Sequence, residues 1–326
     1  MAGVSDSDTR GISAIKVVEG FFTTNASAPA SNAKLSFFRR FDKIPTSWDA
    51  FQEQINLLVK SSRNVKVVYF VRHAQGYHNV AEEKYGVGRW EDEFARTDEF
   101  LDPDLTPFGV EDAKTKGPPS VKTELERGMP PIERVVVSPL SRAIQTAQSF
   151  FTKDQVPNRS FLCMENCREV FDCYTFDKRR SLSEIKSKFP DVDFKRMKDE
   201  GDLLWSPTHH ETEDEIHERA RNFLSELFDA VPERYVVVVS HVCFIQAVCA
   251  VAMGIHFRPD NCETMGSLLS ISSSSPPPAE QKRILGATEN TKSPTAASTE
   301  PLFLDEVKAN LPLGATRVFA APFSAS

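Results

Sequence analysis

Three apolar, β-branched runs recur along the chain, and none of them alternates between apolar and polar positions. They are NVKVVYFV (64–71), ERVVVS (133–138) and RYVVVVS (234–240). Uninterrupted apolar runs of this length are typical of strands that are buried on both faces of a parallel sheet. The second and third runs lead directly into helix-like segments, and such alternation predicts an α/β fold. We therefore expect a three-layer sandwich, with a mostly parallel central sheet flanked by helices on both faces.

Helix signals occupy the segments around these runs. SWDAFQEQINLLVK (47–60) is amphipathic, and Ser47 is placed to cap its first turn. Further along, Thr212 and Glu215 have the spacing of a capping box, which predicts a helix beginning there. The apolar segment 261–272 is expected to supply a last strand.

A third helix is predicted over DLTPFGVEDAKTKG (104–117). Thr106 is the expected N-cap and Pro107 the first helical residue, because a proline there gives up no intrahelical hydrogen bond. Gly117 is expected to lie near the end of this helix, where glycine commonly terminates helices.

The composition divides the chain into four parts. The apolar runs belong to one large domain, which is preceded by a mixed segment expected to pack on its core. The following segment is rich in Ser, Pro, Thr and Ala and cannot bury enough apolar surface to offset its ordering. The expected parts are an N-terminal extension (1–63), the α/β domain (64–272), a disordered linker (273–301) and a C-terminal tail (302–326).

Composition also narrows the partners and the location. The chain has 326 residues and a formal net charge of −7, which argues against nucleic acid or an anionic membrane as its main partner. A small anionic substrate remains compatible with a local basic pocket. The sequence has no apolar signal core and no run of about 18–20 apolar residues, so a cytoplasmic location is predicted. The six cysteines form no Cys-x-x-Cys pair, which favours reduced, structural thiols.

Polar side chains, among them two arginines and two histidines, follow the three apolar runs. The first run delivers Arg72 and His73, the second Ser138 and then Arg142, and the third Ser240 and His241. Parallel α/β sheets bind ligands beyond the carboxyl ends of their strands. A guanidinium matches phosphate oxygens, and a neutral imidazole can attack phosphorus. The pattern predicts a phosphate pocket in which Arg72 binds the anion that His73 attacks.

These stretches resemble a known family. VRHAQGYHN, DPDLTPFGVEDA, VVVSPLSRAIQTA and VVVVSHVCFIQAV occur in this order over residues 64–272 and are similar to the motifs of the histidine phosphatase superfamily. CREVFDCYTFDKRRSLSE resembles its phosphoglycerate-mutase-like branch of plants and fungi. The resemblance implies that His73 becomes phosphohistidine, that Arg72, Arg142 and His241 complete the phosphate pocket, and that Glu169 gives the leaving group its proton.

The resemblance also suggests substrate-binding positions. Asn79 stands where the family places an asparagine that contacts the phosphoryl group, and Gly76 keeps the loop after the nucleophile narrow. Val242 follows His241 where a smaller residue is usual, so its side chain is expected to shape the pocket. No metal and no other cofactor is expected, because the arginines neutralise the substrate.

The predicted function is hydrolysis of a small phosphomonoester through phosphohistidine. Two alternatives remain open: a phosphoglycerate-type mutase, and a catalytically weak phospho-ligand-binding scaffold, which only Val242 favours. Arg179 and Arg180 either contact a second anionic group or form a solvated face. His78 follows His73 by five residues, the wrong spacing for one helical face, which argues against a zinc pair there. The segment 209–217 has a metal-like composition, but a helix start explains it better. The sequence names neither the substrate nor the oligomeric state.

Overall fold

The computed structural model describes residues 15–23, 36–38, 40–61, 63–156 and 161–271. The linker and tail predicted over 273–326 lie outside these residues. The strands are β1 (Ile15–Val17), β2 (Asn64–Arg72), β3 (Arg134–Val137), β4 (Phe161–Cys163), β5 (Val192–Asp193), β6 (Tyr235–Ser240) and β7 (Thr264–Ile271). The α-helices are α1 (Trp48–Lys60), α2 (Tyr77–Tyr85), α3 (Val87–Arg89), α4 (Pro107–Glu126), α5 (Ser141–Phe150), α6 (Leu182–Lys188), α7 (Glu213–Ala230) and α8 (Val242–Met253). Short turns of 3-10 or π-helix are η1 (Trp90–Phe94), η2 (Asp98–Phe100), η3 (Glu165–Cys167) and η4 (Thr175–Asp177).

The strands form one sheet in the order β1-β7-β2-β6-β3-β4-β5. The neighbours from β2 to β5 are all parallel, as the apolar runs predict. The predicted last strand exists as β7, and it pairs antiparallel with β2 and with β1. The register sets Arg72 opposite Ser240 and Val137 opposite Val239. The three predicted runs therefore end side by side.

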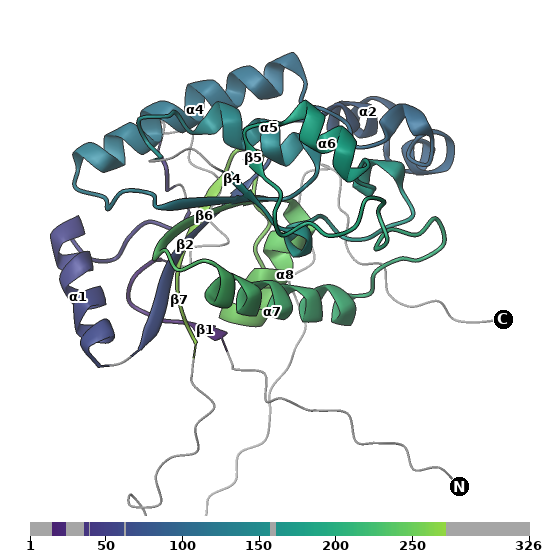
Figure 1. Ribbon diagram of the computed structural model, residues 1–326. Helices are drawn as coiled ribbons and strands as arrows, with labels where there is room; N and C mark the ends of the chain where they lie inside the picture. Colours follow the sequence, from purple (N-terminus) through teal and green to yellow (C-terminus); the bar gives the residue numbers. More distant parts are fainter. Residues whose placement is uncertain (1–14, 24–35, 39, 62, 157–160, 272–326) are drawn as a thin grey trace, which may run out of the picture. The chain divides into compact units, whose positions relative to one another are not determined.

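Helices cover both faces of this sheet, which confirms the three-layer sandwich (Figure 1). Val67 and Val71 of β2 face a core shared with α1, α4 and α5. Val68 and Phe70 of the same strand face the opposite core, which is shared with α7 and α8. Successive side chains of a strand point to opposite faces, so an entirely apolar strand supplies both cores at once.

The predicted N-caps are present. The side chains of Ser47, Thr106 and Thr212 accept hydrogen bonds from backbone N–H groups in the first turns of α1, α4 and α7. Thr212 and Glu215 form the reciprocal capping box. These local interactions involve residues three apart in the sequence, which is why the sequence alone identifies them.

The predicted end of α4 is wrong, because the helix continues through Pro118 and Pro119 to Glu126. Gly117 has a different role from the one expected. A Cβ atom at this position would lie 2.5 Å from the Phe150 ring and from its carbonyl oxygen. Glycine therefore allows α4 and α5 to approach closely. The Pro118 carbonyl accepts a hydrogen bond from the Gln155 side chain at 2.6 Å, which satisfies an acceptor inside the helix.

The described part of the N-terminal segment contributes aromatic side chains to the core. Phe22, Phe38 and Phe51 are buried beside Tyr69 of β2, with ring centroids of Phe22 and Phe38 5.8 Å apart. Arg40 forms an ion pair with Glu263, next to β7. The boundary at residue 63 between extension and domain stays a prediction.

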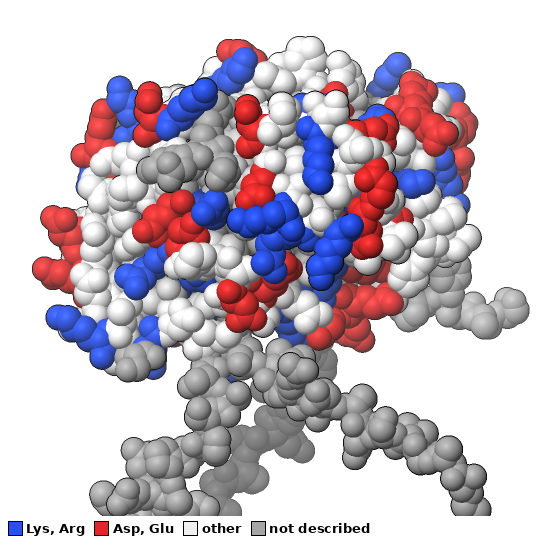
Figure 2. All heavy atoms as spheres, in the orientation of Figure 1, with Lys and Arg blue, Asp and Glu red and all other residues white. Residues whose placement is uncertain are grey.

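Acidic and basic side chains are interspersed over the face shown in Figure 2. Among the described helices, none is both long and apolar enough to cross a bilayer. The predicted cytoplasmic location stays a prediction. All six cysteines are buried free thiols, as expected.

Candidate active site

The carboxyl ends of β2, β3 and β6 bring together the residues that the sequence singles out. The N–H of His73 donates to the Ser240 carbonyl at 2.9 Å, and the N–H of Ser138 donates to the Val239 carbonyl at 3.1 Å. Arg142 lies in the first turn of α5, directly after β3. The strand ends are adjacent because the strands are parallel and in register, so the fold itself assembles the pocket.

His73 is almost completely buried, with 1% of its surface exposed. Its Nδ1 lies 2.7 Å from the carbonyl oxygen of Ala74. A carbonyl only accepts, so Nδ1 carries the proton and Nε2 keeps its lone pair. Burial lowers the pKa of His73 well below its ordinary value, and the charges of Arg142 and Arg72 lower it further. The imidazole is therefore neutral and has a nucleophilic Nε2.

The ring of a second histidine, His241, lies beside His73; His241 is the N-cap residue of α8, but its side chain makes no capping hydrogen bond. The two ring centroids are 5.1 Å apart. Nε2 of His241 lies 2.8 Å from the Ser138 hydroxyl. Burial, and after it the charge of Arg142, lowers the pKa of His241 well below its ordinary value. In the tautomer in which Nε2 accepts from the Ser138 hydroxyl, Nδ1 carries the proton of the neutral ring and can donate to an anion.

Arg142 is fully buried and held at two points. Its Nη1 donates to the Phe176 carbonyl at 2.6 Å, and its Nη2 pairs with Asp177 at 3.0 Å. The Thr146 hydroxyl donates to the Arg142 carbonyl at 2.7 Å and accepts from the N–H of Ala74 at 2.9 Å. This hydroxyl therefore connects the first turns of α5 to the loop after His73.

Arg72 is half-buried at the end of β2. Its Nη1 donates to the Pro259 carbonyl at 3.0 Å. Burial lowers the pKa of Arg72, and the nearby charge of Arg258 adds to this effect. Burial disfavours the charged guanidinium and Arg258 adds a like charge, so a bound anion would stabilise charged Arg72.

Three nitrogen atoms of this pocket are buried without a hydrogen-bond partner among the residues that the structure describes. They are Nε of Arg72, Nε of Arg142 and Nδ1 of His241. A buried donor without a partner costs free energy, and such groups usually have a ligand or water in the functional state. Three of them around a neutral imidazole are suited to an anion such as a phosphate group.

Glu169 lies against the same pocket, at the N-terminus of α8. Its Oε1 accepts from the N–H of Val170 and from the N–H of Cys243, each at 3.0 Å. The Glu169 backbone carbonyl accepts from Arg219 of α7 at 3.1 Å. Oε1 is therefore occupied as an acceptor.

The expected substrate-binding residues have different surroundings. Asn79 accepts from the N–H of Gly76 at 2.9 Å through Oδ1, which leaves its amide group as the possible donor to a ligand. A Cβ at Gly76 would lie 2.8 Å from the His78 ring, so glycine makes room for that imidazole. Val242 is buried in the core between the sheet and α7 and α8.

The sequence analysis missed two residues of the site. His78 is buried and stacks on Phe176, and its ring centroid lies 5.5 Å from that of His73. Its position five residues after His73 excluded a shared helical face but carried no other signal. Asp102 has a φ of 44° and binds Ser141 through both carboxylate oxygens, each at 2.7 Å. It thereby caps α5, the helix that carries Arg142.

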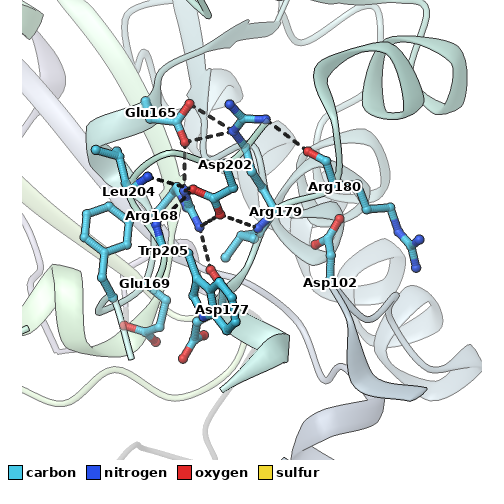
Figure 3. A network of polar contacts seen from close by, with 12 residues as sticks. Asp102, Glu165, Arg168, Glu169, Asp177, Arg179, Arg180, Asp202, Leu204 and Trp205 are labelled. Atoms are coloured by element: carbon cyan, nitrogen blue, oxygen red, sulfur yellow. Dashed lines mark hydrogen bonds and ion pairs between the residues drawn. The ribbon is translucent and has the colours of Figure 1, made fainter. Parts of the chain in front are cut away.

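Arg179 and Arg180 differ in their surroundings. Arg179 is buried and donates to Glu165 and to the carbonyls of Asp199 and Gly201, so its guanidinium holds the loop together. The Arg180 side chain points away from this network (Figure 3) and borders a pocket of about 290 Å³ with Tyr77 and Asp104. Of the two, Arg180 is the one positioned to meet a ligand.

The loops that carry Glu169 and Asp177 are held by a buried network centred on Arg168 (Figure 3). Arg168 binds both carboxylate oxygens of Asp202, at 2.9 Å and 2.6 Å, and donates to the Asp177 carbonyl at 2.6 Å. Asp177 in turn pairs with Arg142. One ion pair therefore supports both Arg142, through Asp177, and the segment next to Glu169.

A neutral buried imidazole between arginines, at the carboxyl edge of a parallel sheet, defines a protein of the phosphatase and phosphomutase class. The family model described as "Histidine phosphatase superfamily (branch 1)" matches residues 68–273, and the chain belongs to this superfamily. This confirms the family that the motifs indicate.

Curated relatives come from plants and fungi, as expected. A "Phosphoglycerate mutase-like protein" of Arabidopsis thaliana is 29% identical over 231 residues, and the match covers 63% of this chain and 80% of that protein. A "Probable phosphoglycerate mutase" of Arthroderma benhamiae is 28% identical over 217 residues, and the match covers 63% of this chain and 64% of the relative. Among solved structures, a mycobacterial glucosyl-3-phosphoglycerate phosphatase matches with a TM-score of 0.39 and 19% identity, over 64% of this chain and 97% of that one.

Proposed function

We propose that the chain is a phosphomonoester hydrolase that acts through a phosphohistidine on His73. The observation that carries this proposal is the state of the imidazole. Nδ1 is held by the Ala74 carbonyl, the pKa is far below its ordinary value, and Nε2 has its lone pair. Such a group is prepared for nucleophilic attack without a separate base.

The first step is in-line attack of His73 Nε2 on the phosphorus atom. The bond between phosphorus and the leaving oxygen breaks, and Oε2 of Glu169 gives this oxygen its proton. Nδ1–H continues to donate to the Ala74 carbonyl, so the positive charge that develops on the ring is stabilised. In the second step Glu169 accepts a proton from water, which attacks the phosphohistidine and releases phosphate.

The remaining pocket residues stabilise the transferring group. Nε of Arg72, Nε of Arg142 and Nδ1 of His241 donate to its oxygens, and the amide of Asn79 is a fourth donor. Preorganised donors of this kind are usually the largest source of catalysis in phosphoryl transfer. They replace a metal ion in neutralising charge, so we propose that no metal or cofactor takes part in the reaction.

The substrate is proposed to be a small phosphorylated molecule. Arg180 borders the neighbouring pocket, where it would meet an anionic group on the rest of the substrate. The net charge of −7 argues against nucleic acid and anionic membranes as binding partners.

A mutase is the second candidate, because the relatives are named as phosphoglycerate mutases or mutase-like proteins. Both functions share phosphohistidine and differ in whether water or a substrate hydroxyl accepts the phosphoryl group. Phosphate release from an aryl phosphate, compared with interconversion of phosphoglycerates, separates the two.

The decisive experiment replaces the nucleophile. His73→Ala is expected to lower phosphate release by about three orders of magnitude or more and to abolish the acid-labile phosphoenzyme. His217→Ala, on the surface of α7, is the matched control and should retain both. Turnover of the wild-type chain should be unchanged in EDTA. Wild-type turnover in a folded His73→Ala variant would refute the proposal.

A further inference from the structure

Two segments far apart in the sequence pair next to the candidate active site. The N–H of Phe171 donates to the Glu211 carboxylate, and the N–H of Glu211 donates to the Phe171 carbonyl, each at 2.8 Å. The first segment follows Glu169 directly, and the second precedes α7. This pairing places the side chains of their neighbours together.

Those neighbours form a cluster of three different donor atoms. An oxygen of Asp172, the sulfur of Cys173 and a ring nitrogen of His210 all lie within 4.8 Å of one another. Nδ1 of His210 lies 2.6 Å from Asp172 Oδ1, which also accepts from the N–H of Cys173 at 2.6 Å. Cys173 is buried, Asp172 is half-buried and His210 is exposed.

We propose that Asp172, Cys173 and His210 form a binding site for a divalent transition metal ion of the zinc type. Thiolate, imidazole and carboxylate are the three ligand types that zinc takes in proteins, and three protein ligands leave the fourth position for water. Magnesium and calcium prefer sites made of oxygen alone, so the sulfur and nitrogen donors select against them.

The geometry needs only a small adjustment. In a tetrahedral zinc site the ligand atoms are about 3–4 Å apart, as follows from metal–ligand distances of about 2.0–2.3 Å. Cys173 is fixed by its burial among Tyr174 and Phe176. His210 is exposed and can rotate, so it supplies the closing movement. On binding, the thiol releases its proton to solvent, and the His210 proton moves to Nε2 so that Nδ1 binds the ion.

The Cys173 sulfur lies within 4.8 Å of the donor atoms of both Asp172 and His210. An ion pair between Asp172 and His210 alone does not account for this third donor atom. The sequence alone does not reveal this cluster, because His210 lies 37 positions after Cys173. The metal-like composition of 209–217 is instead explained by the capping box of α7, and His210 alone of that segment joins the cluster. The inference does not depend on the proposed function, since binding can be measured without substrate.

The test titrates the full-length, reduced chain with Co²⁺ after removal of any affinity tag. A thiolate-to-cobalt charge-transfer band is expected, and Zn²⁺ should displace it. His210→Ala is expected to weaken Co²⁺ binding by at least about tenfold, an effect that even loss of an outer-shell partner can have. His209→Ala is the matched control in the neighbouring position and should bind like the wild type. Cys173→Ser should remove the band.

Thermal unfolding provides a second measurement that needs no cobalt spectrum. Zn²⁺ should raise the melting temperature of the wild type and of His209→Ala, but not of His210→Ala, because an ion that binds the folded state stabilises it. His210 is exposed, so this variant is expected to fold even if Cys173→Ser does not. Absence of the charge-transfer band, or equal affinity of His210→Ala and His209→Ala, would overturn the proposal.

Discussion

The protonation state of two buried histidines is the central property of the site at the scale of single residues. His73 and His241 are both shielded from water and both lie near Arg142, so the charged form of each ring is disfavoured. The burial that keeps the His73 ring neutral therefore lowers the free energy of unfolding in acid, because the folded protein resists protonation of this ring. Function and stability are connected through the same pKa shifts.

Stability is expected to fall as the pH drops below about 6.5, the ordinary pKa of histidine. In this range the unfolded chain binds protons at positions 73 and 241, whereas the folded protein does not, so the unfolded state is favoured. Each histidine contributes a slope of about 1.4 kcal/mol per pH unit. Urea unfolding of the wild type, His73→Gln and His241→Gln between about pH 6.5 and 5 measures this slope. Each substitution removes one proton-binding site, so it should reduce the slope by about 1.4 kcal/mol per pH unit. Unchanged slopes in both variants would contradict the assignment.

At the scale of elements, strands deliver the reacting groups and loops hold them in place. Arg142 lies in the first turn of α5, and its guanidinium is held by an ion pair with Asp177, which lies in η4. The carbonyl of Asp177 depends on Arg168, and Arg168 depends on Asp202 in the loop after β5 (Figure 3). Four segments that are separate in the sequence thus set the position of the Arg142 side chain.

Asp202→Asn is therefore expected to damage both stability and catalysis. The substitution removes the carboxylate that binds buried Arg168 at two points and leaves Glu165, at 2.9 Å, as its remaining ion-pair partner. Breaking a buried pair costs up to about 3–5 kcal/mol. In variant protein that remains folded, kcat/KM should fall because Asp177 no longer holds Arg142. Asp199→Asn, an exposed substitution in the same loop, is the control. Equal denaturation midpoints and equal kinetics for the two variants would show that the network does not position Arg142.

The sequence predicts the elements whose signals are local. The buried strands, the N-caps at Ser47 and Thr106 and the convergence of Arg72, His73, Arg142 and His241 follow from runs and spacings that the chain displays directly. A parallel sheet brings consecutive strand ends to one edge, so the residue types after each run are enough to predict a site.

Other features depend on contacts between distant segments. Arg168 and Asp202 are 34 positions apart and share no periodic pattern. Gly117 resembled a helix end because a close approach to Phe150 leaves no mark in the local sequence. The two neighbours of β7 run antiparallel to it, which an apolar run does not indicate. Such features are set by packing between distant segments. One of them, the Arg168–Asp202 pair, also holds Asp177, which pairs with Arg142.

At the scale of the whole molecule, the described N-terminal segment belongs to the same core as the sheet. Its buried side chains are large and apolar, and they cover the face of β2 that looks toward α1 and α4. It also reaches the site: Arg40 binds Glu263, whose backbone carbonyl accepts from the N–H of Arg72 at 3.1 Å. The segment therefore supports both the fold and the end of β2, where Arg72 lies.

A chain that begins at residue 63 is accordingly expected not to form a stable fold. It lacks the buried side chains Phe21, Phe22, Phe37, Phe38, Phe41, Trp48, Phe51 and Ile55. Burial of each contributes about 1.5–3 kcal/mol, so together they match or exceed the about 5–15 kcal/mol by which a domain is stable. Near-UV circular dichroism and thermal unfolding would show loss of fixed packing and of a cooperative transition.

Two substitutions in α1 make the same test without truncation. Phe51 is buried, with ring centroids 5.2 Å from Phe21 and 5.0 Å from Trp48, whereas Leu57 of the same helix is exposed. Phe51→Ala should lower the free energy of unfolding by about 3–5 kcal/mol, and Leu57→Ala should change it little. A cooperative, wild-type-like transition in the truncated chain, together with equal stabilities of the two variants, would mean that the extension only covers a domain that is complete without it. The expected result instead makes the described residues 15–23, 36–38 and 40–61 part of the fold that supports β2.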